Sequence, residues 1–249
     1  MHYVLVGISH KTAPVAVREK VALNEAQTRE TLVRLKGYTV IDEAVVLSTC
    51  NRTELYVATQ SPRHAELILC EFFKESFEPS ESTAQYFYRA QDREVIAHLF
   101  AVAASLDSQV VGESQITGQG KRALQLSLDQ QAVGVLLKPL FETALFVAGR
   151  VRTETEIGKG CVSIGSVAVQ LTKQIFGSLV DKTVVLIGAG EVGKLVVKYL
   201  NGEKVKETCV VNRTLARARL LEEQGLGTAY PIRELIPLVQ RADVLITSV

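Results

Sequence analysis

The sequence predicts a mixed fold, with an α+β part, a helical segment and a final α/β part built on parallel strands. Three observations support this fold class. Short strand patterns alternate with amphipathic helical patterns over the first part of the chain, which is typical of α+β domains. Helix-forming residues then dominate between about residues 119 and 177. After them, a buried-strand run leads directly into a helical pattern, which indicates a parallel sheet.

The predicted boundaries follow these changes of pattern. Residues 1–150 form a first domain that ends in a long helix, residues 151–178 form a helical linker, and residues 179–249 form the last domain. A chain of 249 residues is long enough for two ordinary domains that each bury a core.

The first domain is expected to contain both strands and capped helices. Asn24 and Gln27 form a capping-box pattern that begins a helix over residues 26–35. Ser61 and Pro62 are typical of the cap and first position of a second helix. Apolar residues at 95, 99, 102, 103 and 106 predict a third helix over 92–107. The strands are expected at 3–8, 43–48, 53–59 and around 85–90.

The helical segment is predicted to form one or two long helices over residues 119–155. Another helix is expected over residues 162–177, and Gly177 is the residue that closes it.

The four cysteines, Cys50, Cys70, Cys161 and Cys209, lie far apart and form no C-x-x-C pair. The sequence therefore indicates neither a zinc site nor a disulfide framework, and no metal is expected. Cys70 lies in a helical pattern and Cys209 in an apolar strand, so both are interpreted as core sulfurs. Cys50 instead ends an apolar run and is followed at once by polar residues, which favours a nucleophile there.

The last domain opens with a strand, a glycine-rich loop and a helix. This order is the fingerprint of a Rossmann-type dinucleotide site, in which Gly188 makes the tight turn and Gly190 lets a pyrophosphate approach the backbone. Gly193 allows the strand and the helix to pack closely, and the helix N-terminus attracts the anion. The expected cofactor contacts in this loop are Gly188, Ala189, Gly190, Glu191, Val192 and Gly193.

The second strand of this domain ends in Asn212-Arg213-Thr214, without the carboxylate that binds the ribose 2′-hydroxyl of NAD. Arg213 suits a 2′-phosphate and Thr214 adds a hydroxyl donor, which favours NADPH over NADH. In the alternative interpretation, Asn212 and Thr214 form only a turn and a helix cap, and Arg213 is solvated.

The last domain has room for fewer than the six strands of a full doubly wound sheet. Because a parallel strand rarely ends a domain without its next crossover, we expect a partial nucleotide-binding domain in this chain.

Charge and hydropathy exclude several classes of protein. The formal net charge is +1, so no strong field attracts nucleic acid or a membrane surface. No run of 18 apolar residues is present, and the N-terminus lacks the pattern of a secretory leader. We expect a soluble protein of the cytoplasm.

Four motifs together give the chain its resemblance to a known family. They are GISHKTAP at residues 7–14, LSTCNRTE at 47–54, HLFAVAASLDSQVVGESQITGQ at 98–119, and VLIGAGEVG followed by VNRT. In this combination the chain resembles the glutamyl-tRNA reductases over nearly its whole length. The resemblance implies reduction of glutamyl-tRNA to glutamate-1-semialdehyde with NADPH, the first step of five-carbon tetrapyrrole synthesis.

The resemblance also implies roles for individual residues. Cys50 is the nucleophile that forms a thioester with the glutamyl group. Arg52 is expected to bind the substrate γ-carboxylate or to ionise Cys50, and Glu54 to hold Arg52 in place. His98 is either an acid/base or orienting residue or a satisfied core histidine at the edge of an apolar stripe.

Other residues match the glutamate pocket of the family less specifically. Thr49, Ser108, Glu113 and Gln115 are expected to bind substrate, or else to bond only their own backbone. The loop Ser9–Thr12 is expected either near substrate or in solvent. Four basic residues would either contact tRNA phosphates or lie on the surface as ordinary solvated side chains: Lys121, Arg122, Arg150 and Arg152.

Family members continue into a spine helix and a dimerisation domain, so the resemblance implies homodimers and channelling to glutamate-1-semialdehyde aminomutase. A eukaryotic member would lie in the plastid stroma. We expect residues 1–249 alone to dimerise poorly. Two other functions stay open: an NADP-dependent oxidoreductase similar to shikimate dehydrogenases, with Cys50 structural, and a non-catalytic NADP- or tRNA-binding fragment.

Overall fold

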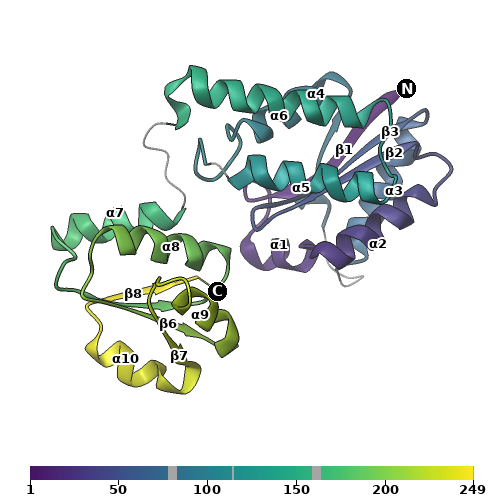
Figure 1. Ribbon diagram of the computed structural model, residues 1–249. Coiled ribbons are helices and arrows are strands. Elements are labelled where there is room, and N and C mark those ends of the chain that lie inside the picture. Colours follow the sequence, from purple (N-terminus) through teal and green to yellow (C-terminus); the bar gives the residue numbers. More distant parts are fainter. Residues whose placement is uncertain (78–82, 114, 159–163, 249) are drawn as a thin grey trace. The chain divides into compact units, whose positions relative to one another are not determined.

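The computed structural model describes residues 1–77, 83–113, 115–158 and 164–248. The chain folds as two compact units, Met1–Cys161 and Val162–Val249. Cys161 and the first two residues of the helix predicted over 162–177 lie outside the described residues. Figure 1 shows the mixed architecture, with helices packed on a sheet in each unit.

The first unit is built on a four-stranded antiparallel sheet in the order β2-β3-β1-β4. The strands are β1 (His2–Ser9), β2 (Glu43–Ser48), β3 (Arg52–Thr59) and β4 (Tyr88–Gln91). All four predicted strands are confirmed, although the last begins late because residues 84–86 form a 3-10 turn.

Helices cover both faces of this sheet (Figure 1). They are α1 (Val15–Val21), α2 (Glu25–Lys36), α3 (Pro62–Lys74), α4 (Arg93–Ala103), α5 (Gln115–Asp129) and α6 (Leu137–Glu154). Along β1, Val4 and Val6 pack into the core beneath α2 and α3, whereas Leu5 packs into the core beneath α4 and α6. Because successive side chains point to opposite faces, a strand covered on both sides is apolar throughout.

The predicted helix starts are confirmed. The side chain of Asn24 accepts from Gln27 N, and the Gln27 side chain accepts from Asn24 N, which completes the capping box of α2. Ser61 and Pro62 occupy the cap and first position of α3, although the Ser61 side chain makes no capping bond.

The helix predicted over residues 92–107 is shorter than expected, and the inclusion of Leu106 was wrong. Helix α4 ends at Ala103, and Ser105 has a φ of 63°, in the left-handed region that a right-handed helix cannot continue. Leu106 follows this break and is 54% exposed. The early end turns the chain back toward the sheet, so residues 105–113 contribute to the site described below.

The second unit holds a four-stranded parallel sheet in the order β7-β6-β5-β8. Its strands are β5 (Thr183–Ile187), β6 (Glu207–Asn212), β7 (Thr228–Pro231) and β8 (Val244–Thr247), and its helices are α7 (Ile164–Phe176), α8 (Glu191–Gly202), α9 (Leu215–Glu222) and α10 (Leu235–Arg241). The first strand lies inside the sheet and the second and fourth flank it, which is the strand order of half a Rossmann fold.

Helix α7, which the sequence placed in the linker, packs against α8 inside the second unit. A Cβ atom on Gly165 would lie 2.8 Å from the backbone nitrogen of Val196, so the two helices approach closely. The helix ends at Phe176, and the φ of 72° at the next residue, Gly177, makes the left-handed turn expected of a closing glycine.

Candidate functional site

Cys50 lies in the tight turn that connects β2 to β3. Thr49 closes this turn, because its hydroxyl oxygen accepts from the backbone nitrogens of Asn51 and Arg52, each at 3.1 Å. The backbone nitrogen of Thr49 also donates to the carbonyl oxygen of Arg52 at 2.8 Å. The turn presents Cys50 as an exposed residue, whereas Cys70 and Cys209 are buried in the cores as predicted.

Cys50 borders a small pocket formed by the turn and by the segment that enters α5. The lining residues are Thr49, Cys50, Asn51, Arg52, Ser108, Glu113, Gln115, Ile116 and Gln119. The structure therefore brings together six of the predicted site residues from two segments far apart in the sequence. His98 is the member of the predicted catalytic and substrate-binding set that does not line this pocket.

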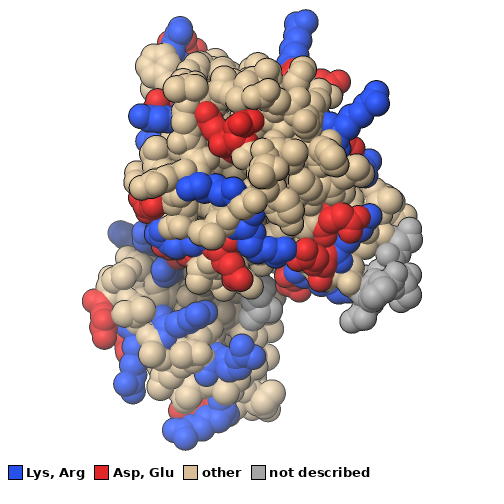
Figure 2. All heavy atoms as spheres, turned by 90° about the vertical axis from the view of Figure 1, so that its right-hand side faces the viewer, with Lys and Arg blue, Asp and Glu red and all other residues tan. Residues whose placement is uncertain are grey.

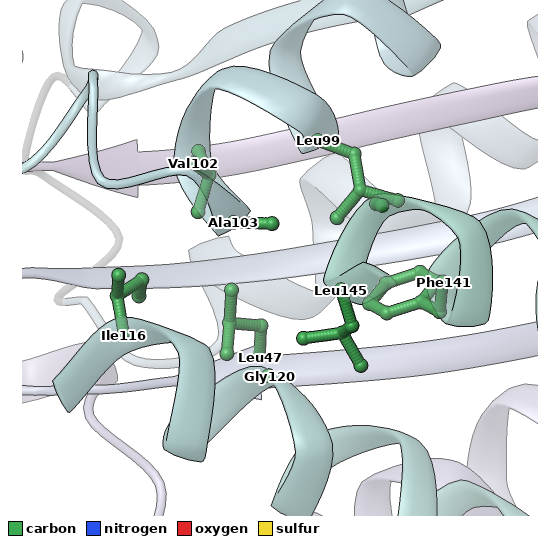
Figure 3. A pocket seen from close by; sticks show the side chains of 9 residues that line it. Leu47, Leu99, Val102, Ala103, Ile116, Gly120, Phe141 and Leu145 are labelled. Atoms are coloured by element: carbon green, nitrogen blue, oxygen red, sulfur yellow. The ribbon is translucent and has the colours of Figure 1, made fainter. Parts of the chain in front are cut away.

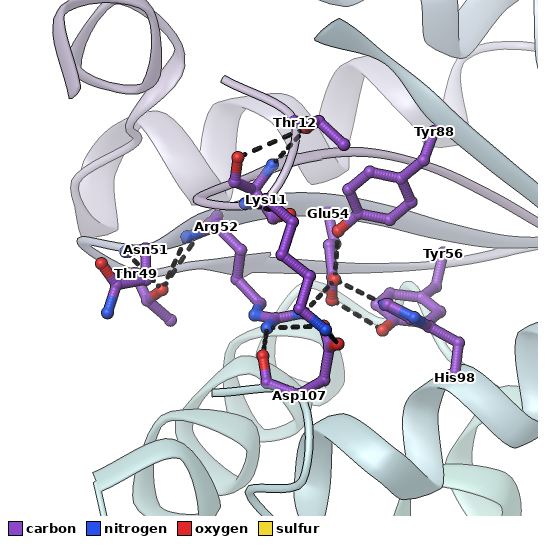
Figure 4. Close-up of polar contacts among 11 residues, drawn as sticks. Lys11, Thr12, Thr49, Asn51, Arg52, Glu54, Tyr56, Tyr88, His98 and Asp107 are labelled. Carbon is purple, nitrogen blue, oxygen red and sulfur yellow. Dashed lines mark hydrogen bonds and ion pairs between the residues drawn. The ribbon is translucent and has the colours of Figure 1, made fainter. Parts of the chain in front are cut away.

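Arg52 is 2% exposed and carries two ion pairs (Figure 4). Its Nη1 donates to Glu54 Oε1 at 2.7 Å, and its Nη2 donates to Asp107 Oδ2 at 3.0 Å and to the Asp107 carbonyl oxygen. Burial disfavours the charged guanidinium, but the negative charge of Glu54 overcomes this and raises the pKa of Arg52. Glu54 and Asp107 therefore fix the position of the Arg52 side chain.

Glu54 is fully buried at the centre of a polar network. Its carboxylate accepts from Tyr56 Oη at 2.7 Å, from His98 Nε2 at 2.7 Å and from the hydroxyl of Tyr88 (Figure 4). Burial alone would raise the pKa of Glu54, but the hydrogen bond from His98 and the charge of Arg52 lower it to about 2. A fully paired buried carboxylate such as this one stays ionised.

His98 reaches this network from α4, and its ring also lies beside that of Tyr88, with centroids 5.4 Å apart. The side chain is 22% exposed, so it is neither fully buried nor free. Both interpretations of His98 therefore find support: it is a satisfied histidine at the edge of a core, and it is bonded to the residue that orients Arg52.

The loop after β1 joins the same site. Lys11 forms an ion pair with Asp107, and the backbone nitrogen of His10 donates to the carbonyl oxygen of Asn51 at 2.9 Å. Burial and the nearby charge of Arg52 lower the pKa of His10. Its Nδ1 is buried and has no hydrogen-bond partner in the described part of the chain.

Glu113 lines the same pocket as the Cys50 turn. Burial raises the pKa of its carboxyl group, while a hydrogen bond with Ser108 opposes that rise. Arg152 of α6 donates to the Glu113 carbonyl oxygen at 2.8 Å and so holds this segment in place. Of the other basic residues considered for tRNA, Arg122 pairs with Glu25 and Arg150 with Glu154.

The surroundings of Cys50 raise the pKa of its thiol and so disfavour the thiolate. Although the residue as a whole is exposed, partial burial of its thiol and the charge of Glu113 raise the pKa, while a backbone hydrogen bond and the charge of Arg18 oppose that rise. Arg18 was not identified from the sequence. It lies on α1, and nothing in its local pattern shows that it reaches the Cys50 turn.

An apolar pocket lies deeper in the first unit, between α4, α5 and α6 (Figure 3). Its lining residues are Leu47, Leu99, Val102, Ala103, Ile116, Gly120, Phe141, Ala144 and Leu145. None of these side chains carries a polar atom, so this cavity is a packing feature of the core and offers no chemistry. Ile116 borders both this cavity and the Cys50 pocket.

The glycine loop of the second unit has the geometry that a dinucleotide site needs. Gly188 has a φ of 105°, and a Cβ atom there or on Gly193 would collide with backbone oxygens. Gly190, in contrast, faces open space, with no atom within 4 Å of an added Cβ. It is the N-cap of α8 and leaves the first-turn N–H groups without a side-chain cap. The loop therefore fits a pyrophosphate over Gly190.

Asn212 joins the end of β6 to this loop. Its Oδ1 accepts from the backbone nitrogen of Ala189 at 3.3 Å, and its Nδ2 donates to the carbonyl oxygen of Thr214 at 2.9 Å. Arg213 is exposed and makes no ion pair or side-chain hydrogen bond with other described residues. Thr214 precedes α9, but its side chain does not cap that helix.

A metal site and a membrane-spanning helix each place their own requirements on the described residues. No group of three His, Cys, Asp or Glu side chains within the described ranges is arranged to hold a metal ion. None of the described helices is both long and apolar enough to span a membrane. Acidic and basic side chains are interspersed on the face that Figure 2 shows.

The second unit, with its Rossmann-type parallel sheet and glycine loop, belongs to the class of dinucleotide-binding domains. It is joined to an α+β unit that carries an exposed cysteine. Residues 6–155 match the family model of the glutamyl-tRNAGlu reductase N-terminal domain, and residues 170–249 match that of shikimate / quinate 5-dehydrogenase. The chain belongs to the glutamyl-tRNA reductase family. The family and the fold of the second unit imply a nicotinamide cofactor.

Individual relatives agree with this assignment. The chain is 42% identical over 250 residues to glutamyl-tRNA reductase from Magnetococcus marinus, covering 100% of this chain and 59% of that relative. It is 43% identical over 244 residues to the one from Desulfotalea psychrophila, covering 98% of this chain and 57% of that relative. The chain thus spans less than two thirds of the length of these relatives.

A solved structure is also similar. Glutamyl-tRNA reductase from Methanopyrus kandleri matches with a TM-score of 0.60 and 34% sequence identity, over 98% of this chain and 58% of that one. The likeness covers the described parts of both units.

Proposed function

We propose that this chain takes part in the NADPH-dependent reduction of glutamyl-tRNA to glutamate-1-semialdehyde, with Cys50 as the nucleophile. The observation that carries the proposal is that six predicted residues, including the exposed Cys50, line one small pocket. Membership of the glutamyl-tRNA reductase family supports the same substrate.

The first step of the proposed reaction is acyl transfer to Cys50. Its thiolate attacks the carbonyl carbon of the glutamyl ester, a carbon–sulfur bond forms, and the bond to the tRNA ribose oxygen breaks. That oxygen leaves and takes up a proton. A thiolate suits this step because it is strongly nucleophilic and later leaves well from the thioester.

The glutamyl group would be held by charged and polar groups of the pocket. Arg52 offers a positive charge for the γ-carboxylate, and its ion pairs with Glu54 and Asp107 hold the guanidinium ready. Glu113, Ser108, Thr49 and Gln115 line the same pocket and would bind the α-amino group and orient the ester. His98 acts through Glu54 in this proposal and helps to orient Arg52.

The second unit would hold NADPH. Gly188–Gly193 accept the pyrophosphate over the open position of Gly190, and Arg213 binds the 2′-phosphate as an unpaired cation. When bound there, the cofactor would supply a hydride, with which the thioester on Cys50 would be reduced to the aldehyde and the Cys50 thiolate released. Homodimerisation, channelling to an aminomutase and a cytoplasmic location remain predictions.

The test uses tRNA charged with radiolabelled glutamate. Without NADPH, the protein is expected to acquire label that survives denaturation, and the Cys50→Ser variant is expected to acquire none. Cys70→Ser is the matched control, because Cys70 is buried in the core of the same unit and should leave labelling intact. Added NADPH should release the label as the aldehyde. Equal labelling of the Cys50→Ser variant would refute the proposal.

A second function has one specific observation in its favour. Residues 170–249 match shikimate / quinate 5-dehydrogenase, and this half alone fits an NADP-dependent oxidoreductase acting on a small hydroxy acid. The Cys50→Ser variant separates the two functions. Hydride transfer between NADPH and small hydroxy acids or ketones that survives this substitution would favour the dehydrogenase.

A further inference from the structure

Arg18 reaches from α1 to the turn that carries Cys50. Its Nη1 donates to the carbonyl oxygen of Cys50 at 2.7 Å and to Asn51 Oδ1 at 3.0 Å. Asn51 is held from the other side as well, since its carbonyl oxygen accepts from the backbone nitrogen of His10. One guanidinium group therefore ties two consecutive residues of the turn to the first helix.

The other cations near the site already form ion pairs with carboxylates of the first unit. Arg52 pairs with Glu54 and Asp107, and Lys11 pairs with Asp107 as well. Arg18 forms no ion pair with a carboxylate within the described ranges, and its Nε is buried without a hydrogen-bond partner there. Arg18 thus keeps a positive charge that is not cancelled, and it lies directly against the Cys50 turn.

We propose that Arg18 is a positioning residue for the reaction of Cys50, fixing the turn through its hydrogen bonds and stabilising the thiolate through its charge. The catalytic part of this inference rests on the proposed function. The effect of Arg18 on the ionisation of the Cys50 thiol does not rest on that function, because the reactivity of a cysteine can be measured without any substrate.

The charged groups that face Cys50 come from three elements. Arg18 extends from α1, Glu113 precedes α5, and Arg52 begins β3. The charge of Glu113 opposes ionisation, and the charge of Arg18 promotes it, as the pKa of Cys50 reflects. Because Arg52 is already paired with two carboxylates, loss of Arg18 would leave Glu113 as the dominant charge at the thiol.

The experiment measures alkylation of Cys50 by iodoacetamide between pH 7 and pH 10, with the modified residue identified by peptide mass spectrometry. In Arg18→Ala the midpoint of the rate profile is expected to rise by roughly half to one pH unit, slowing alkylation near pH 8 about three- to tenfold. Arg18→Lys keeps the charge and should recover most of the rate. Arg18→Gln keeps an NH₂ donor but loses the charge, so it should not recover the alkylation rate.

Arg34→Ala is the matched control, since Arg34 is an exposed arginine of the same unit that pairs with Glu75. An Arg18→Ala profile that coincides with that of the wild type, at equal thermal stability, would overturn the inference. If Arg18→Ala does not fold, the comparison of Arg18→Lys with Arg18→Gln decides in the same way: equal midpoints reject the charge effect.

Turnover provides the second readout. With glutamyl-tRNA and NADPH, Arg18→Ala is expected to lower kcat by at least tenfold with little change in KM, because Arg18 holds the Cys50 turn but does not itself line the substrate pocket. A wild-type protein without reductase activity would refute the proposed function, and the alkylation profiles would still decide the role of Arg18.

Discussion

The buried carboxylate of Glu54 accepts a hydrogen bond from Nε2 of His98 at 2.7 Å. Since Glu54 stays ionised, Nε2 must carry the proton, whether His98 is neutral or charged. The contact also links α4 to β3, so the position of Arg52 depends on a residue outside the pocket.

Loss of the Glu54 carboxylate should destabilise the first unit. Glu54→Ala leaves the Arg52 guanidinium with one carboxylate partner and two tyrosine hydroxyls without their acceptor, so we expect a loss of about 3–5 kcal/mol. Chemical denaturation followed by circular dichroism measures it. Glu66→Ala removes an exposed partner of Arg89 and should cost less than about 1 kcal/mol. Similar losses of unfolding free energy in Glu54→Ala and Glu66→Ala would contradict the central role of Glu54 in the polar network.

Acid should destabilise the same unit for a related reason. The pKa of Glu54 is about 2 in the folded chain, below the value of about 4.3 expected when unfolded. A lowered pKa gives stability that is fully present above the unfolded value and is lost as pH falls through the folded value. About 3 kcal/mol should therefore disappear between about pH 5 and pH 2. Denaturation midpoints across this range check it, and Glu54→Gln should show a flatter dependence.

Two glycines of the nucleotide loop, Gly190 and Gly193, should respond differently to alanine. Gly193→Ala should unfold or strongly destabilise the second unit, because its Cβ would collide with the Gly188 carbonyl oxygen. Gly190→Ala should leave thermal stability nearly unchanged but weaken NADPH binding, because the open space above it is where the pyrophosphate would lie. Calorimetric binding and melting curves distinguish these effects. Unchanged NADPH affinity in Gly190→Ala would argue against a dinucleotide at this loop.

Cofactor preference should depend on Arg213. Arg213→Ala is expected to reduce NADPH affinity roughly tenfold, about 1.4 kcal/mol, and to leave NADH affinity unchanged. Arg217→Ala is the control, since Arg217 is an exposed arginine on the following helix. Fluorescence titration with both cofactors measures the ratio. Parallel losses for NADPH and NADH would show that Arg213 does not recognise the 2′-phosphate.

Local patterns were enough to predict most of the secondary structure. The capping box at Asn24, the glycine that closes α7 and the strand before the glycine loop are all short-range signals, and each is confirmed. Leu106 was misplaced because its spacing continues the apolar stripe of α4, while the left-handed conformation of Ser105 has no distinct sequence pattern.

The site was only partly predictable, because several of its contacts join distant segments. Cys50 and Arg52 could be identified from one short motif, and the residues of 108–115 from their likeness to a family pattern. Arg18, Asp107 and Tyr88 were not identified, since they reach the site only through packing of α1, the turn after α4 and β4. Polar residues are common on protein surfaces, and sequence spacing alone does not distinguish those that reach a site from those that face only solvent.

Asn212 limits how the nucleotide preference of this chain can be redesigned. An acidic residue substituted at 212 has no N–H to donate to the Thr214 carbonyl, so it would disconnect the start of α9 from the glycine loop. The same carboxylate introduced at position 213 would leave that connection intact. Engineering toward NADH should therefore begin at the exposed arginine and keep the asparagine beside it.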